Sequence, residues 1–204
     1  MKRIGIIGGT FDPIHLAHVS IAEEAKKRLD LDKVIFIPAG SQPLKIDKKV
    51  TRASLRFNMV EKAIAGYEGF EVSDYEIKKQ GLSYTFETLE HFQKEDEKIF
   101  FITGADCLLN LEKWKGVKRI FQLCTLVVLT RPGYDNEKLY EQKSYIEDKY
   151  KGEILILELP GMDISSTEIR QRVKEGKDIS KLVAKEVFKL IKDNDLYMGE
   201  WNGE

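Results

Sequence analysis

The sequence has little cysteine, little histidine and no long apolar run. Its 204 residues include 2 cysteines and 3 histidines. Cys107 and Cys124 belong to no CxxC pair or metal-type spacing, which excludes a disulfide framework and a cysteine-based zinc site, so we expect buried thiols. No stretch approaches the roughly 20 apolar residues that a membrane-spanning helix needs. We therefore expect no membrane partner.

A targeting signal and a strong net charge are also lacking. The apolar run at residues 4–7 is too short for a signal peptide, so the expected location is cytoplasmic. With 33 basic and 34 acidic residues the formal net charge is −1, which argues against nucleic acid as a partner. An anionic ligand would then require positive charge gathered at one place. The length fits a single domain spanning residues 1–204.

Short β-branched runs alternate with helical patterns along the chain, which is typical of a parallel sheet covered by helices. The expected strands are residues 3–7, 34–38, 98–103, 126–130 and 154–159, with a shorter extended segment near residues 70–77. The expected helices are residues 16–29, 52–65, 85–93, 136–150, 166–175 and 182–191. This order predicts an α/β fold: a Rossmann-like doubly wound parallel sheet with helices on both faces and a small C-terminal helical part. Ligands bind such sheets beyond the carboxyl ends of the strands.

The segment Gly8–His18 lies between the first expected strand and the first expected helix. Its paired glycines, Gly8 and Gly9, allow the backbone to approach a ligand closely. The helix that follows directs its positive end toward the same place, which suits an anion. The segment matches neither GxGxxG nor a Walker loop.

His15 and His18 are three residues apart at the start of that helix, so they share one face. Two imidazoles there can donate hydrogen bonds to a phosphate that gains charge in a transition state. Three alternatives stay open: surface histidines, a transition-metal site with Asp12, and glycines that serve only a tight turn.

Near the other end of the chain, Ser165 and Glu168 match a capping box that opens a helix. The hydroxyls of Ser165, Ser166 and Thr167 also suit a phosphate at a helix start, with Arg170 one turn further on. A helix cap and a phosphate cradle are both compatible with these residues. Their position after the last expected strand puts them at the same sheet edge as the glycine loop.

The segments GGTFDPIHLAH and ISSTEIR together resemble the nucleotidyltransferase superfamily that carries HxGH and ISSTxIR signatures. Within it, the chain is similar over essentially its whole length to the bacterial nicotinate-nucleotide adenylyltransferases. One departure is Ala17, where glycine is usual; we expect a slightly tighter site and retained activity.

The resemblance implies transfer of AMP from ATP to nicotinate mononucleotide, with magnesium carried by ATP and no covalent enzyme intermediate. It implies that His18, and secondarily His15, stabilise the reacting phosphates. The residues implied for ATP binding are Gly8, Gly9, Thr10, Phe11, Ser165, Ser166, Thr167 and Arg170.

The resemblance also implies a set of residues for nicotinate mononucleotide: Lys45, Tyr84, Thr85, Asp106, Trp114 and Arg131. Each has a plainer interpretation, such as a solvated lysine, half-buried aromatic rings, or Asp106 as a helix cap. Arg52 and Arg56 could add positive charge, but an exposed helical face explains them equally well. Trp201 is compatible with a subunit contact in a homo-oligomer or with a loose chain end. The rival functions are an enzyme acting on another phosphate acceptor and a non-catalytic nucleotide-binding regulator.

Overall fold

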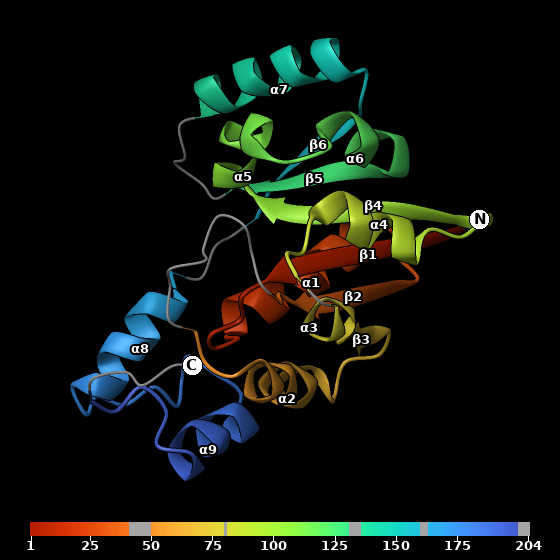
Figure 1. Cartoon of the computed structure of the whole chain (residues 1–204). Coiled ribbons are helices and arrows are strands. Elements are labelled where there is room, and N and C mark those ends of the chain that lie inside the picture. The colour runs from red at the N-terminus through yellow and green to blue at the C-terminus, as the bar shows by residue number, and fades with distance from the viewer. Residues whose placement is uncertain (41–49, 80, 131–135, 160–162, 200–204) are drawn as a thin grey trace.

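A computed structural model describes residues 1–40, 50–79, 81–130, 136–159 and 163–199. Its centre is a parallel sheet of six strands in the order β3-β2-β1-β4-β5-β6 (Figure 1). The strands are β1 (Lys2–Gly9), β2 (Lys33–Pro38), β3 (Phe70–Val72), β4 (Glu97–Gly104), β5 (Cys124–Thr130) and β6 (Ile154–Glu158). The predicted Rossmann-like doubly wound sheet is confirmed.

Successive side chains along the strands pack alternately into two separate apolar cores, one on each face of the sheet. In β1, Ile4 and Ile6 belong to one core, while Ile7 belongs to the other together with Phe36 of β2. Successive side chains of a strand point to opposite faces, so these nearly continuous apolar runs bury both faces of the sheet.

Helices cover both faces of the sheet. Those whose apolar side chains enter the first core are α1 (Leu16–Arg28), α2 (Ala53–Ile64), α8 (Ser166–Lys174) and α9 (Lys185–Asp193). Those that cover the second core are α4 (Thr85–Phe92), α5 (Ala105–Leu109), α6 (Val117–Leu123) and α7 (Asn136–Tyr150). Figure 1 shows α8 and α9 near α2, on the side of the molecule away from α7.

Short helical segments were missed by the sequence analysis. Besides α5 and α6, they are α3 (Tyr75–Lys78) and the 3-10 helix η2 (Leu111–Lys113). The expected extended segment near residues 70–77 is correct only for β3, because α3 occupies its end. Helices of about two turns or fewer contain too few repeats for a periodic apolar pattern.

The order in which the chain adds strands to the sheet reverses between β1 and β4. From β1 the chain proceeds to β2 and β3 on one side, and β4 then starts the other half beside β1. Ligands bind outside the carboxyl ends of the strands at such a switch point. Gly8 and Gly9 end β1 here, and Gly104 ends β4. Within the described ranges, no helix is both long and apolar enough to cross a membrane.

Candidate active site

The loop from β1 to α1 has an unusual backbone. The sequence predicted that Gly8 and Gly9 begin this loop, but in the structure they are the last two residues of β1. Phe11 follows with a positive φ of 50°, buried, and the Asp12–Pro13 peptide is cis. A Cβ on Gly9 would lie 2.9 Å from the ring of Phe11, whereas a Cβ on Gly8 would meet no atom closer than 3.7 Å. Gly9 therefore makes room for the phenylalanine that shapes the loop.

His15 and His18 stack on each other at the start of α1. Their ring centroids are 3.7 Å apart with an interplanar angle of 26°. The rings of Phe11 and His18 meet edge-on, with their centroids 5.1 Å apart. His15 is the N-cap residue, and its backbone N–H donates to Nδ1 of His18 at 3.3 Å. A ring nitrogen that accepts a hydrogen bond carries no proton, so neutral His18 carries its proton on Nε2. That nitrogen is thereby set up as a donor.

Both histidines are neutral at physiological pH. Burial, and secondarily the nearby His15, lowers the pKa of His18 to about 3. Burial lowers the pKa of His15 to about 4. The pair is therefore suited to donating hydrogen bonds, and an incoming polyanion would favour its protonation.

Asp12 is held away from the histidines by its own partners. Its side chain is buried; Oδ1 accepts a hydrogen bond from the hydroxyl of Tyr197 at 2.7 Å, and Oδ2 accepts one from the backbone N–H of Thr51 at 3.2 Å. Among the residues that the structure describes, no group of three or more histidine, cysteine or acidic side chains could hold a metal ion. In the structure, Asp12, His15 and His18 therefore do not form a group of metal ligands.

The serine motif opens α8, as predicted. Oγ of Ser165 accepts a hydrogen bond from the backbone N–H of Glu168 at 3.1 Å. The carboxylate of Glu168 pairs instead with Arg172 at 2.8 Å, so only the first half of the predicted capping box forms.

The same motif also contacts the loop that carries the histidines. Ser166 donates from Oγ to the carbonyl oxygen of Pro13 at 2.9 Å. Arg170 donates to the carbonyl oxygen of Asp12 at 2.7 Å and to Oγ1 of Thr167 at 3.2 Å. Segments separated by about 150 residues therefore meet at the carboxyl end of β1, where the sequence had placed both.

Arg56 is buried, which corrects the interpretation of an exposed helical face; only Arg52 is exposed. Its guanidinium donates to the carbonyl oxygens of Thr10 at 2.7 Å, Ala39 at 2.8 Å and Thr51 at 2.9 Å. Burial lowers the pKa of Arg56, while nearby Asp12 raises it. The arginine ties the glycine loop to the end of β2 and the start of α2.

The sequence did contain a signal for this arginine. The buried residues of α2 are spaced by three and four positions: Arg56, Met59, Val60, Ala63 and Ile64. An arginine in phase with an apolar helical face is expected to be buried, and a buried guanidinium needs several acceptors.

Residues expected to contact the pyridine nucleotide lie in two neighbouring segments. Half-buried Tyr84 is the N-cap of α4, directly before Thr85, and the ammonium of Lys115 lies 4.4 Å from the centre of its ring. Half-buried Trp114 precedes that lysine and contacts Phe101 edge-on at 6.1 Å between centroids. The structure thus brings Tyr84 close to the segment that holds Trp114.

The remaining residues expected to contact the pyridine nucleotide are Asp106, Lys45 and Arg131. Asp106 is exposed in the first turn of α5, directly after the end of β4. The N-cap is Gly104, so the alternative that Asp106 caps the helix is wrong. Lys45 and Arg131 lie outside the described residues.

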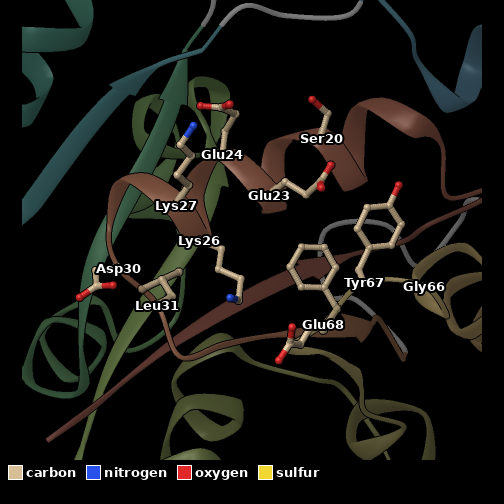
Figure 2. A pocket seen from close by; sticks show the side chains of 11 residues that line it. Ser20, Glu23, Glu24, Lys26, Lys27, Asp30, Leu31, Gly66, Tyr67 and Glu68 are labelled. Carbon is tan, nitrogen blue, oxygen red and sulfur yellow. The ribbon is translucent and has the colours of Figure 1, made fainter.

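A surface hollow of about 740 Å³ lies elsewhere, between α1 and the residues that join α2 to β3 (Figure 2). None of the predicted site residues lines it. Its lining mixes both signs of charge: Glu23, Glu24, Lys26, Lys27, Asp30 and Glu68. Four of these six side chains are acidic and would repel a triphosphate, so we place the candidate site at the histidine loop.

Comparison with known proteins gave consistent results. A sequence model of the cytidylyltransferase-like family matches residues 6–172. A protein of Clostridium botulinum named a probable nicotinate-nucleotide adenylyltransferase is 54% identical, over 98% of this chain and all of its own length. A protein of Clostridium tetani with the same name is 47% identical over 97% of this chain and all of its own length. The structure of Plasmodium falciparum nicotinic acid mononucleotide adenylyltransferase complexed with NaAD is similar in fold, with a TM-score of 0.79 and 19% identity, covering 97% of this chain and 98% of that one.

Proposed function

This chain belongs to the cytidylyltransferase-like family and, within it, to the nicotinate-nucleotide adenylyltransferases, and from that premise we propose its reaction. It transfers AMP from ATP to nicotinate mononucleotide, which gives nicotinate adenine dinucleotide and pyrophosphate. The proposal draws its substrates from the names of relatives about half identical over the full chain.

One observation supports it above the others. The contacts of Ser166 with Pro13 and of Arg170 with Asp12 join the serine motif to the histidine loop. Donors from both ends of the chain are thereby gathered at the edge of the sheet where nucleotides bind. Such an arrangement suits a long anion like a triphosphate, which needs several donors in a row.

The chemistry is a direct in-line displacement. A 5′-phosphate oxygen of nicotinate mononucleotide forms a bond to the α-phosphorus of ATP. The bond from that phosphorus to the oxygen bridging to the β-phosphate breaks, and pyrophosphate leaves with the electron pair. Such transfers are accelerated chiefly by positioning and charge stabilisation, so no protein nucleophile is needed.

The two histidines act as donors in this step. The proton on Nε2 of His18 hydrogen-bonds the phosphate oxygens on which charge grows, and His15 assists. Both rings are neutral before ATP binds, so burying them does not require the burial of a charge. Backbone groups of Gly8, Gly9, Thr10 and Phe11 place the phosphates, and the α8 residues Ser165, Ser166, Thr167 and Arg170 hold the β- and γ-phosphates.

Magnesium enters with ATP in this proposal. The carboxylate of Asp12, in the same loop as the histidines, already accepts hydrogen bonds on both oxygens. Magnesium keeps several waters and binds substrate phosphates readily, so the ion needs no dedicated protein cage here. When bound, it neutralises phosphate charge.

The acceptor lies on the other side of the switch point. Tyr84 and Trp114 supply ring area to the pyridine, and the start of α4 at Thr85 supplies backbone donors to its carboxylate. Asp106 binds the ribose, and Lys45 and Arg131 bind the acceptor phosphate.

Pyrophosphate release in the presence of ATP and magnesium tests the proposal. Nicotinate mononucleotide, nicotinamide mononucleotide and phosphopantetheine are compared as acceptors. We expect the highest kcat/KM with the nicotinate compound. A preference for another acceptor would overturn the substrate assignment, and ATP binding without release for any acceptor would favour the non-catalytic regulator.

A further inference from the structure

Tyr197 reaches the histidine loop from the opposite end of the chain. It follows α9, its side chain is 4% exposed, and its hydroxyl donates to Oδ1 of Asp12 at 2.7 Å. The hydroxyl of Thr51 lies 3.5 Å from the same phenolic oxygen. The proposed reaction assigns no role to this tyrosine.

The backbone of Tyr197 has a positive φ of 66°. A bulky residue in this region is strained, and such strain persists only where surrounding contacts determine the conformation. Asp195, two residues earlier, also has a positive φ, of 47°. The chain therefore turns sharply after α9 to deliver the tyrosine side chain into the interior.

Asp12 is the point at which these contacts converge. Its carboxylate accepts hydrogen bonds from Tyr197 and from the backbone of Thr51, and its carbonyl oxygen accepts one from Arg170. Asp12 lies three residues before His15, and residues 11–15 of this loop, Asp12 included, are all buried. A shift of Asp12 would move the histidines and the arginine relative to each other.

We propose that Tyr197 is a positioning residue for the transfer reaction, acting through Asp12 on the histidine loop and on Arg170. This inference rests on the proposed function. The phenol of Tyr197 donates a short hydrogen bond to Oδ1 of the buried Asp12 carboxylate. Without the phenol this oxygen loses that hydrogen bond, and the side chain is expected to shift toward another donor. A displacement of about 1 Å in reacting groups can lower a rate by about 100-fold.

Tyr197→Phe tests the proposal because it keeps the buried ring and removes only the hydroxyl. We expect kcat to fall about 10-fold and KM for ATP to change less than about 2-fold, since the groups are misaligned rather than lost. Tyr140→Phe on α7 is the matched control, because that tyrosine is 53% exposed, and its kcat should equal that of the wild type. The unfolding midpoint of each variant is measured alongside. A kcat of Tyr197→Phe equal to wild type, or lowered only by the unfolded fraction, would overturn the inference.

Nitrogen-15 NMR of the histidine rings gives a second readout that does not depend on turnover. In the wild type we expect His18 as the Nε2–H tautomer. Tyr197→Phe should shift the ring signals of His15 and His18 and leave those of exposed His91 unchanged. Unchanged signals for the active-site pair would contradict positioning.

The two proposals fail in different ways. A wild-type enzyme that releases no pyrophosphate with any acceptor would overturn the function, while the NMR comparison would still decide whether Tyr197 positions the loop. An active wild type with unaffected Tyr197→Phe would retain the function and overturn the role of the tyrosine.

Discussion

His18 has two tasks in the structure, and two substitutions can separate them. Its Nδ1 accepts the backbone N–H of His15 and so caps α1, while the proton on its Nε2 is aimed, in the proposed mechanism, at the phosphates. Glutamine at the third helical position is the usual partner in a capping box. His18→Gln can therefore keep the cap and lose the imidazole, whereas His18→Ala loses both.

The magnitudes follow from these contacts. Removing a preorganised donor to a charged transition state lowers kcat by about 10²- to 10³-fold, or about 2.7 to 4 kcal/mol. His15 stacks on His18 and can replace part of its effect, so we expect about 100-fold for both variants. The capping bond is long, at 3.3 Å, so its loss should cost about 0.5 to 1 kcal/mol of unfolding free energy in His18→Ala only.

The assay measures pyrophosphate release at saturating ATP and nicotinate mononucleotide, with urea unfolding of the same samples. His91→Gln is the control, because this histidine is exposed and stacks on Tyr75 away from the loop. If His18→Gln kept more than about a third of the wild-type kcat, the assignment of the imidazole as a transition-state donor would be refuted. If His18→Gln were as destabilised as His18→Ala, the capping argument would be refuted.

Lowering the pH from about 7.5 to about 5 should destabilise the fold. The pKa values of His15 and His18, about 4 and about 3, lie below that of unfolded histidine, so the unfolded chain binds more protons. The loss should be about 2 kcal/mol per ring at pH 5, and urea unfolding of the His15→Gln, His18→Gln double variant should show a correspondingly smaller dependence on pH. Arg56→Met removes three hydrogen bonds, two of them buried and one partly buried, and should lower the unfolding free energy by about 3 to 5 kcal/mol in urea unfolding. A loss below about 1 kcal/mol would contradict its role in joining the segments. Gly9→Ala places a Cβ 2.9 Å from a phenylalanine ring and should cost about 1 to 3 kcal/mol, whereas Gly8→Ala has room and should stay within about 0.5 kcal/mol of wild type in urea unfolding.

The main strands could be predicted from their nearly continuous apolar runs, and the longer helices from apolar residues that repeat at regular spacings. Strand β4 and helix α7 are examples, since both are long enough for a pattern to emerge. Helices α3 and α5 span 4 and 5 residues, too few for a repeat. Their ends are set by contacts with other parts of the chain, which no local pattern records.

The candidate site could be predicted only in part for a related reason. The histidine and serine segments were found because each carries its chemistry in a few consecutive residues. Asp12 and Tyr197 form a single contact across 185 positions, and a tyrosine between Leu196 and Met198 gives no local sign of it. The assignments of Lys45 and Arg131 remain predictions, because both lie outside the described residues.

The contacts beneath the loop explain how it can bind an anion with its main chain. Arg56 engages the carbonyl oxygen of Thr10, and Ser166 engages that of Pro13. In a trans peptide the N–H points opposite to the carbonyl of the same plane, so a carbonyl turned toward the interior turns the next N–H outward. The N–H of Phe11 is thereby directed away from Arg56, and in the proposed function it donates to a phosphate. In the proposed function, Arg56 would therefore contribute to phosphate binding without touching the ligand, because it fixes the backbone that would bind the phosphate.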